Sequence, residues 1–278
     1  MIRTLTYAFL LISLLFGCDS SEELKGSEKE AQLVNGFNKE LLIKIKRDTI
    51  SAYALIAEGN DKKETIILIK GYPGNDNNFD LAQELRNNGY NVILFNHRGA
   101  WGSQGEYLYS NCLEDVEYLI NFLIEPETSE KLRIDTNNFT LIGRSLGSGV
   151  ALIAGSKIHR VKKIVGISNV NYGELMKNKS DLSELKGYSN YMEKQIMMNH
   201  DVNKFLNELI EFKNEYNVLS HFEKLSTKEI LLLENSDKND DWIRQLNNPD
   251  VRHISSDHNF TSERKFMIEE ILRWIKTN

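Results

Sequence analysis

A serine flanked by glycines follows a short apolar run near the middle of the chain, where residues 139–149 read FTLIGRSLGSG. A serine hydroxyl on a sharp turn between a strand and a helix can attack a carbonyl carbon. The chain on either side of such a turn passes so close that only glycine-sized residues fit, and Gly143 and Gly147 occupy those places around Ser145. The following helix would direct backbone N–H groups at developing negative charge. The pattern predicts a nucleophile at Ser145.

A serine on such a turn must be held between a strand and a helix, and the rest of the chain has patterns typical of both. From Leu41 onward, β-type runs alternate with segments of helical period, which is typical of an α/β sheet with helices on its faces. The first two runs predict an antiparallel hairpin, and the later apolar runs predict strands covered on both faces. We therefore expect a mostly parallel sheet of eight strands, over residues 41–46, 50–57, 65–70, 91–95, 139–142, 163–167, 229–234 and 251–254.

One long segment, residues 171–225, interrupts this alternation after the sixth strand. It has no strand pattern, but Phe205, Leu209 and Phe212 recur at helical spacing. A structureless loop of this length would be unusual inside a compact domain. We predict a helical insertion that serves as a lid over the site.

Together these features resemble the α/β-hydrolase family of serine hydrolases, over residues 41–277. The family places its catalytic groups in the chain order serine, acid, histidine. The resemblance implies that His258, after the last strand, is the general base and then acid, and that Asp237 orients it. The family usually has Gly-x-x-Asp where this chain reads NSDK at 235–238, so Asp240 or Asp241 could serve instead of Asp237.

A second glycine-containing loop, KGYPG at 70–74, resembles the family's His-Gly-x-x-Gly segment, with Lys70 in place of the histidine. The resemblance implies that the backbone N–H groups of Tyr72 and Leu146 form the oxyanion hole. No cofactor motif is recognisable. His253 and His258 have no third ligand at a recognisable spacing, so we predict no catalytic metal.

The first residues have the pattern of a secretory signal, with Arg3 followed by an apolar run over 5–16. The segment LFGC at 15–18 resembles the lipobox of bacterial lipoproteins, which implies cleavage after residue 17 and lipidation of Cys18. Alternatives are an ordinary cleaved signal or a disulfide between Cys18 and Cys112. The expected organisation is a signal over 1–17, a lipidated cysteine and polar tether over 18–38, and a hydrolase domain over 39–278, on the extracytoplasmic side of a membrane.

Composition argues against a nucleic-acid-binding protein. The net charge is −6, and the sequence has no basic stripe that could bind nucleic acid.

The expected activity is hydrolysis of a small carboxylic ester through an acyl-enzyme on Ser145. A serine peptidase acting on short peptides is the alternative within the same chemistry. The alternative from another class is a lipoprotein that binds a ligand without catalysis. In that case we would expect the triad of serine, acid and histidine to be incomplete.

Overall fold

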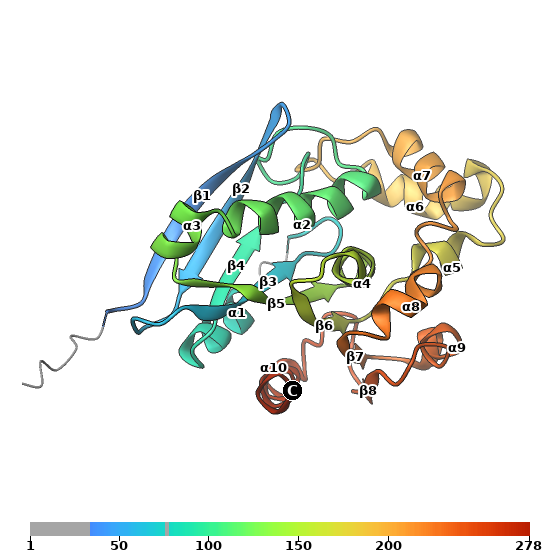
Figure 1. Ribbon diagram of the computed structural model, residues 1–278. Helices are drawn as coiled ribbons and strands as arrows, with labels where there is room; N and C mark the ends of the chain where they lie inside the picture. Colours follow the sequence, from blue (N-terminus) through green and yellow to red (C-terminus); the bar gives the residue numbers. More distant parts are fainter. Residues whose placement is uncertain (1–33, 76–77) are drawn as a thin grey trace, which may run out of the picture. The chain divides into compact units, whose positions relative to one another are not determined.

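The computed structural model describes residues 34–75 and 78–278, so the predicted signal and Cys18 lie outside the described residues. Its centre is an eight-stranded sheet in the order β1-β2-β4-β3-β5-β6-β7-β8 (Figure 1). The strands are β1 Phe37–Ile45, β2 Asp48–Ile56, β3 Lys63–Ile69, β4 Asn91–Phe95, β5 Ile134–Arg144, β6 Val161–Ile167, β7 Glu229–Glu234 and β8 Asp250–His253. The predicted α/β architecture is confirmed.

The direction of the strands decides where chemistry can occur. β1 and β2 form an antiparallel hairpin, and β2 pairs antiparallel with β4. All the remaining neighbours, from β4 to β8, are parallel. The carboxyl ends of the parallel strands therefore share one edge, which is where open α/β sheets bind ligands.

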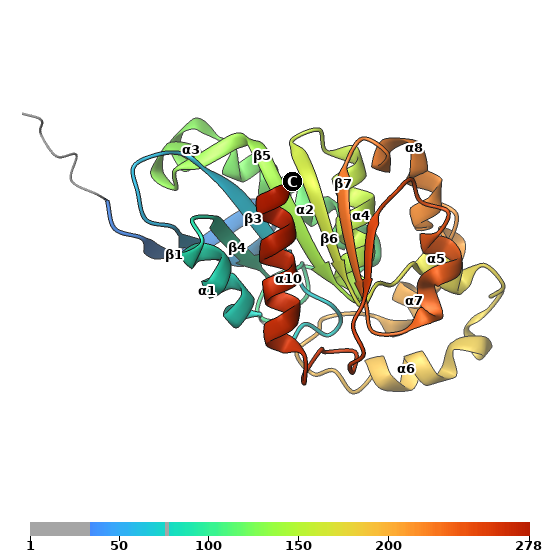
Figure 2. The same ribbon diagram turned by 90° about the horizontal axis from the view of Figure 1, so that it is seen from below.

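Helices cover both faces of the sheet, because successive side chains of a strand point to opposite sides. On β3, Ile67 and Ile69 pack in one core with α2 and α4, whereas Ile66 and Leu68 pack in the other with α1 and α10. Figure 2 shows α1 and α10 together on one side of the strands. The helices are α1 Phe79–Asn87, α2 Tyr109–Leu123, α3 Pro126–Lys131, α4 Leu146–Lys157 and α10 Arg264–Thr277.

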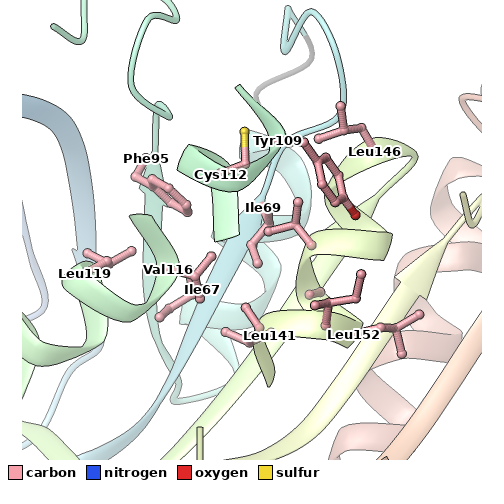
Figure 3. Close-up of a cluster of buried hydrophobic side chains, with 14 of the residues drawn as sticks. Ile67, Ile69, Phe95, Tyr109, Cys112, Val116, Leu119, Leu141, Leu146 and Leu152 are labelled. Atoms are coloured by element: carbon pink, nitrogen blue, oxygen red, sulfur yellow. The ribbon is translucent and has the colours of Figure 1, made fainter. Parts of the chain in front are cut away.

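The core on the α2 and α4 side reaches up to the turn that carries Ser145. Figure 3 shows Leu146 at the start of α4 next to Tyr109 and above Ile69. Leu146 is 1% exposed, and Ile69 is also 1% exposed. Burial of Leu146 therefore fixes the first turn of α4 against the end of β3.

Residues 171–225 are helical, with short turns between the helices. The elements are α5 Tyr172–Met176, η1 Leu182–Leu185, α6 Lys186–Met192, α7 Val202–Glu211, η2 Val218–His221 and α8 Phe222–Leu225. α7 begins at a clear cap, because the Asp201 side chain accepts a hydrogen bond from Lys204 N at 3.0 Å. Its apolar face buries Phe205, Leu206 and Leu209. Among the described residues, no helix has both the length and the apolar character needed to cross a membrane.

Candidate active site

Ser145 occupies the turn between β5 and α4, in a strained backbone conformation. Its φ of 54° and ψ of −123° lie outside the regions that side chains other than glycine normally adopt. The Ser145 N–H donates to the carbonyl of Ile167 at 2.9 Å. The Ser145 carbonyl accepts from the hydroxyl of Ser148 at 2.7 Å. Bonds on both sides of the residue therefore maintain a conformation that the isolated chain would avoid.

The two glycines of the motif make the turn sterically feasible. A Cβ atom on Gly143 would lie 2.0 Å from the carbonyl oxygen of Gly147, and one on Gly147 would lie 2.4 Å from the carbonyl oxygen of Ile69. Both separations are far inside van der Waals contact with backbone atoms that cannot move aside. Glycine at 143 and 147 is therefore a condition for the geometry of Ser145.

The loop after β3 lies directly beside this serine. A Cβ atom on Gly71 would be 3.0 Å from the Cβ of Ser145 and 3.7 Å from its Oγ. Tyr72 is the next residue, so its N–H belongs to the segment that faces the serine. Leu146 follows Ser145 at the start of α4. Of the two residues predicted to supply the oxyanion hole, Leu146 thus directly follows the nucleophile and Tyr72 follows the glycine that approaches it, and their roles stay a prediction.

The loop that carries His258, between β8 and α10, is joined to the same edge of the sheet. The hydroxyl of Ser168, just after β6, donates to the carbonyl of His258 at 2.9 Å. The side chain of Arg144 donates to the side chain of Asn259, which connects the neighbours of the serine and of the histidine. Within the described residues no hydrogen bond joins the side chains of Ser145 and His258, so their pairing stays a prediction.

His258 is electrostatically suited to be neutral at pH 7. The residue is exposed, yet the protein atoms around its ring partly desolvate it, and this lowers its pKa below the ordinary 6.5. The positive charges of Arg144 and Lys238 act in the same direction, while Asp257 opposes them. A neutral imidazole is the form that can accept a proton from a serine hydroxyl.

The predicted acid has another partner in this arrangement. The Asp237 side chain is 90% exposed, and its Oδ1 lies 3.3 Å from Nδ1 of His253. Asp240 approaches the other ring nitrogen of His253 at 3.4 Å. Asp241 is exposed. The structure brings Asp237 and Asp240 together around His253 and leaves His258 without a carboxylate from this loop, so the choice of triad acid stays a prediction.

His253 lies beside two of the candidate acids. It ends β8 and is exposed at the carboxyl edge of the sheet. Asp237, Asp240 and His253 offer ligand atoms within 4.8 Å of one another, a grouping that could hold a metal ion. Spacing did not reveal it because His253 lies in a different segment from the two aspartates. Nδ1 and Nε2 of His253 face the carboxylates of Asp237 and Asp240, respectively.

Glu234 is a buried carboxylate just before the loop of the candidate acids, and the sequence did not single it out. It ends β7, is 1% exposed, and accepts hydrogen bonds from Asn169 at 2.6 Å and Asn239 at 2.9 Å. Burial raises its pKa above the ordinary value, with these hydrogen bonds opposing the rise. Because Asn239 lies between Asp237 and Asp240, Glu234 anchors the loop that carries the candidate acids.

A buried ion pair supports the loop after β4. Asp115 is fully buried and accepts from the backbone N–H of Arg98 at 2.9 Å and from its Nε at 2.5 Å. Nδ1 of His97 lies 3.2 Å from the same carboxylate. Arg98 and His97 therefore both contact Asp115, and these contacts hold the loop after β4.

Comparison with known proteins places this chain in a family. The alpha/beta hydrolase fold family matches residues 64–249, and the chain belongs to it. Membership confirms the predicted fold and the hydrolase class. No curated protein matches the sequence.

Solved structures with this fold include several esterases. One from Pyrococcus furiosus is 15% identical, with a TM-score of 0.62 and coverage of 87% of this chain and 91% of that one. One from Exiguobacterium antarcticum is 18% identical, with a TM-score of 0.61 and coverage of 86% and 100%. A thermostable carboxyl esterase from Bacillus coagulans is 13% identical, with a TM-score of 0.62 and coverage of 86% and 98%. At these identities the likeness concerns the fold.

Proposed function

We propose that this protein hydrolyses carboxylic esters through a covalent acyl-enzyme on Ser145. The observation that carries the proposal is the strained turn at Ser145, with φ at 54° and the glycine loop at Gly71 against its side chain. Strain of this kind persists only where the surrounding structure enforces it, and it concentrates at reactive sites.

In the first half-reaction the Ser145 hydroxyl attacks the ester carbonyl while His258 accepts its proton. The carbonyl oxygen becomes negative, and the N–H groups of Tyr72 and Leu146 stabilise it. His258 then donates the proton to the leaving oxygen of the ester, so that the alcohol departs as the carbon–oxygen bond breaks. The product that stays behind is an ester between the acyl group and Ser145.

In the second half-reaction water replaces the alcohol. His258 takes a proton from the water as its oxygen attacks the acyl carbon, and then returns a proton to Ser145 as the acid leaves. Asp237 would balance the charge on the imidazolium. In the observed arrangement Asp237 contacts His253 instead, so this role requires the loop over 235–241 to turn its carboxylate toward His258.

Esters are favoured over amides because an alkoxide leaves with less demand on the general acid than an amine does. The solved structures with this fold named above are called esterases, which supports the same choice. The expected substrate is a small ester. Cleavage of a short peptide instead would indicate the peptidase alternative.

The proposal has a direct test. A fluorophosphonate probe should label the wild-type protein and should not label Ser145→Ala. Ser255→Ala, which alters an exposed serine of the loop that carries His258, should label like wild type. A panel of p-nitrophenyl acyl esters should be hydrolysed, and aminoacyl and prolyl p-nitroanilides should not. Preference for the anilides would indicate a peptidase. A wild-type chain that resists the probe and cleaves neither series would be a binding protein.

We also propose that the mature protein is a lipoprotein anchored through Cys18 on the extracytoplasmic side of a membrane. The support is the LFGC segment at 15–18 after an apolar run. Mass spectrometry of the purified protein should find diacylglyceryl and acyl groups on an N-terminal Cys18, and Cys18→Ser should release the protein from the membrane fraction. An unmodified cysteine would contradict the anchor.

A further inference from the structure

The connector between α6 and α7, residues 193–201, runs along the loop after β4. Asn199 N–H donates to the carbonyl of Gly99 at 2.6 Å, and the Asn199 carbonyl accepts from Tyr107 N–H at 2.8 Å. Two residues earlier, the carbonyl of Met197 accepts from Trp101 N–H at 3.0 Å. Backbone hydrogen bonds thus fasten this part of the insertion to a loop at the carboxyl edge of the sheet.

The side chain of Tyr72 connects the glycine loop to the same connector. Its hydroxyl lies 2.7 Å from Nε2 of His200 and shares a hydrogen bond with it. The Tyr72 ring packs against Tyr107, Tyr191 and Phe205, with ring centroids 5.5, 6.0 and 6.4 Å away. The aromatic neighbours surround the ring. At its tip the hydroxyl makes its shorter contact with His200, and it also lies 3.4 Å from the carbonyl of Met192, the last residue of α6.

A second bond holds the residue that follows. The indole Nε1 of Trp101 donates to the carbonyl of Pro73 at 2.6 Å. The peptide segment around Tyr72 is therefore fixed through its own side chain and through the next carbonyl group. One contact joins Tyr72 to the connector and the other joins Pro73 to the loop after β4, and these two segments are hydrogen-bonded to each other.

The protonation states suit this hydrogen bond. Burial lowers the pKa of His200 below its ordinary 6.5, so the ring is neutral near pH 7. Burial also raises the pKa of the Tyr72 hydroxyl, which therefore stays protonated. A neutral histidine with its proton on Nδ1 accepts through Nε2, and Tyr72 is then the donor.

We propose that His200 is a positioning residue for the oxyanion hole, and that it acts by holding the side chain of Tyr72. This inference rests on the proposed ester hydrolysis. Donors of an oxyanion hole must lie within about 3 Å of the oxygen that becomes negative. Because Gly71 already approaches Ser145 closely, a small displacement of the loop would move the Tyr72 N–H out of that range.

The test compares four variants with wild type in steady-state hydrolysis of a p-nitrophenyl ester. His200→Ala and Tyr72→Phe should each lower kcat by roughly tenfold, with KM changed by less than about twofold, because the interaction is needed in the transition state. The double variant should be no slower than either single variant, since both remove the same bond. His200→Gln, whose amide oxygen can accept from Tyr72, should recover most of the rate.

His221→Ala is the matched control, because His221 is another histidine of the insertion and its Nε2 contacts the carbonyl of Glu215 at 2.9 Å instead of the glycine loop. It should keep the wild-type kcat. Thermal melting of every variant separates loss of the fold from loss of positioning.

The outcomes distinguish the two proposals. An active wild type with unchanged kcat in His200→Ala and Tyr72→Phe overturns the role of His200 and leaves ester hydrolysis standing. Additive losses in the double variant also overturn it. A folded wild type that hydrolyses no ester overturns the proposed function, and the positioning role falls with it.

Discussion

The hydroxyl of Ser168 donates to the backbone carbonyl of His258 at 2.9 Å, across 90 positions of sequence. Ser168 directly follows β6, whose last residue, Ile167, accepts a hydrogen bond from the N–H of Ser145. The end of one strand therefore holds both the strained serine turn and the loop of the histidine. This shared support is the structural basis for expecting the two groups to act together.

Removing the Ser168 hydroxyl should weaken catalysis. Loss of one hydrogen bond, worth about 1 kcal/mol, should lower kcat by roughly fivefold by loosening the His258 loop. Ser168 has a positive φ of 47°, so the wild type and Ser168→Ala carry the same backbone strain, which Ser168→Gly relieves. Because both variants lack the hydroxyl, steady-state kinetics should show the loss in Ser168→Ala and in Ser168→Gly; a wild-type kcat in Ser168→Ala would contradict a role for the hydrogen bond.

The pH dependence of kcat/KM should report His258. Its pKa is lowered, so activity should fall only as the pH drops through a value below 6.5. Arg144 contributes to this lowering, and Arg144→Gln should move the acid midpoint upward while Arg144→Lys keeps it. Asp257 opposes the lowering, so Asp257→Asn should move the midpoint downward. A midpoint insensitive to both charges would exclude His258 as the base.

The triad acid can be identified by charge removal. Asp237→Asn should lower kcat by about 10²- to 10⁴-fold, because the imidazolium would lose its counter-charge. Asp240→Asn, which alters the other carboxylate beside His253, should have a small effect. Measured kcat values with the opposite ranking would assign the acid to Asp240 instead.

The glycines of the serine turn should not tolerate a methyl group. Gly147→Ala places a Cβ 2.4 Å from a backbone oxygen, so we expect loss of probe labelling together with a lower melting temperature. Gly187→Ala is the control, because its Cβ would meet nothing within 4 Å. In the helix α6 this change should stabilise the protein by about 0.5 kcal/mol. Equal effects of the two substitutions would contradict the tight turn.

The buried carboxylate of Asp115 should matter for stability. Asp115→Asn leaves the buried Arg98 beside a neutral amide, which should lower the free energy of unfolding by about 3 kcal/mol. Glu117→Gln, an exposed change on the same helix, should alter it by less than about 0.5 kcal/mol. Urea denaturation measures both, and similar values for the two would show that the Asp115 charge is not structurally important.

The sequence predicted the sheet well where strands are apolar and poorly where they are polar. The strand around Ile142 was expected over 139–142, yet β5 begins at Ile134, because the polar residues 135–138 form strand without an apolar pattern. The serine turn was predictable since its chemistry demands glycine at fixed spacing. The triad acid was not predictable, because Asp237, Asp240 and Asp241 lie within five residues of one another. Spacing along the chain cannot show which of them faces a histidine.

The contact between Tyr72 and His200 was equally beyond local reasoning. The two residues are 128 positions apart, and neither belongs to a motif that requires the other's side chain. Such a pair arises only once the insertion has packed against the edge of the sheet. Sequence pattern therefore predicted the candidate reacting groups, whereas the contacts that hold their loops emerged only from the tertiary structure.

The hydrogen bonds between Asn199 and the segment from Gly99 to Tyr107 limit how this enzyme could admit its substrate. Lifting the connector away from the sheet would break those bonds and also separate His200 from Tyr72. On the proposed role of His200, a wide opening at this point would disorder the oxyanion hole. Substrate entry by this route would therefore have to alternate with chemistry.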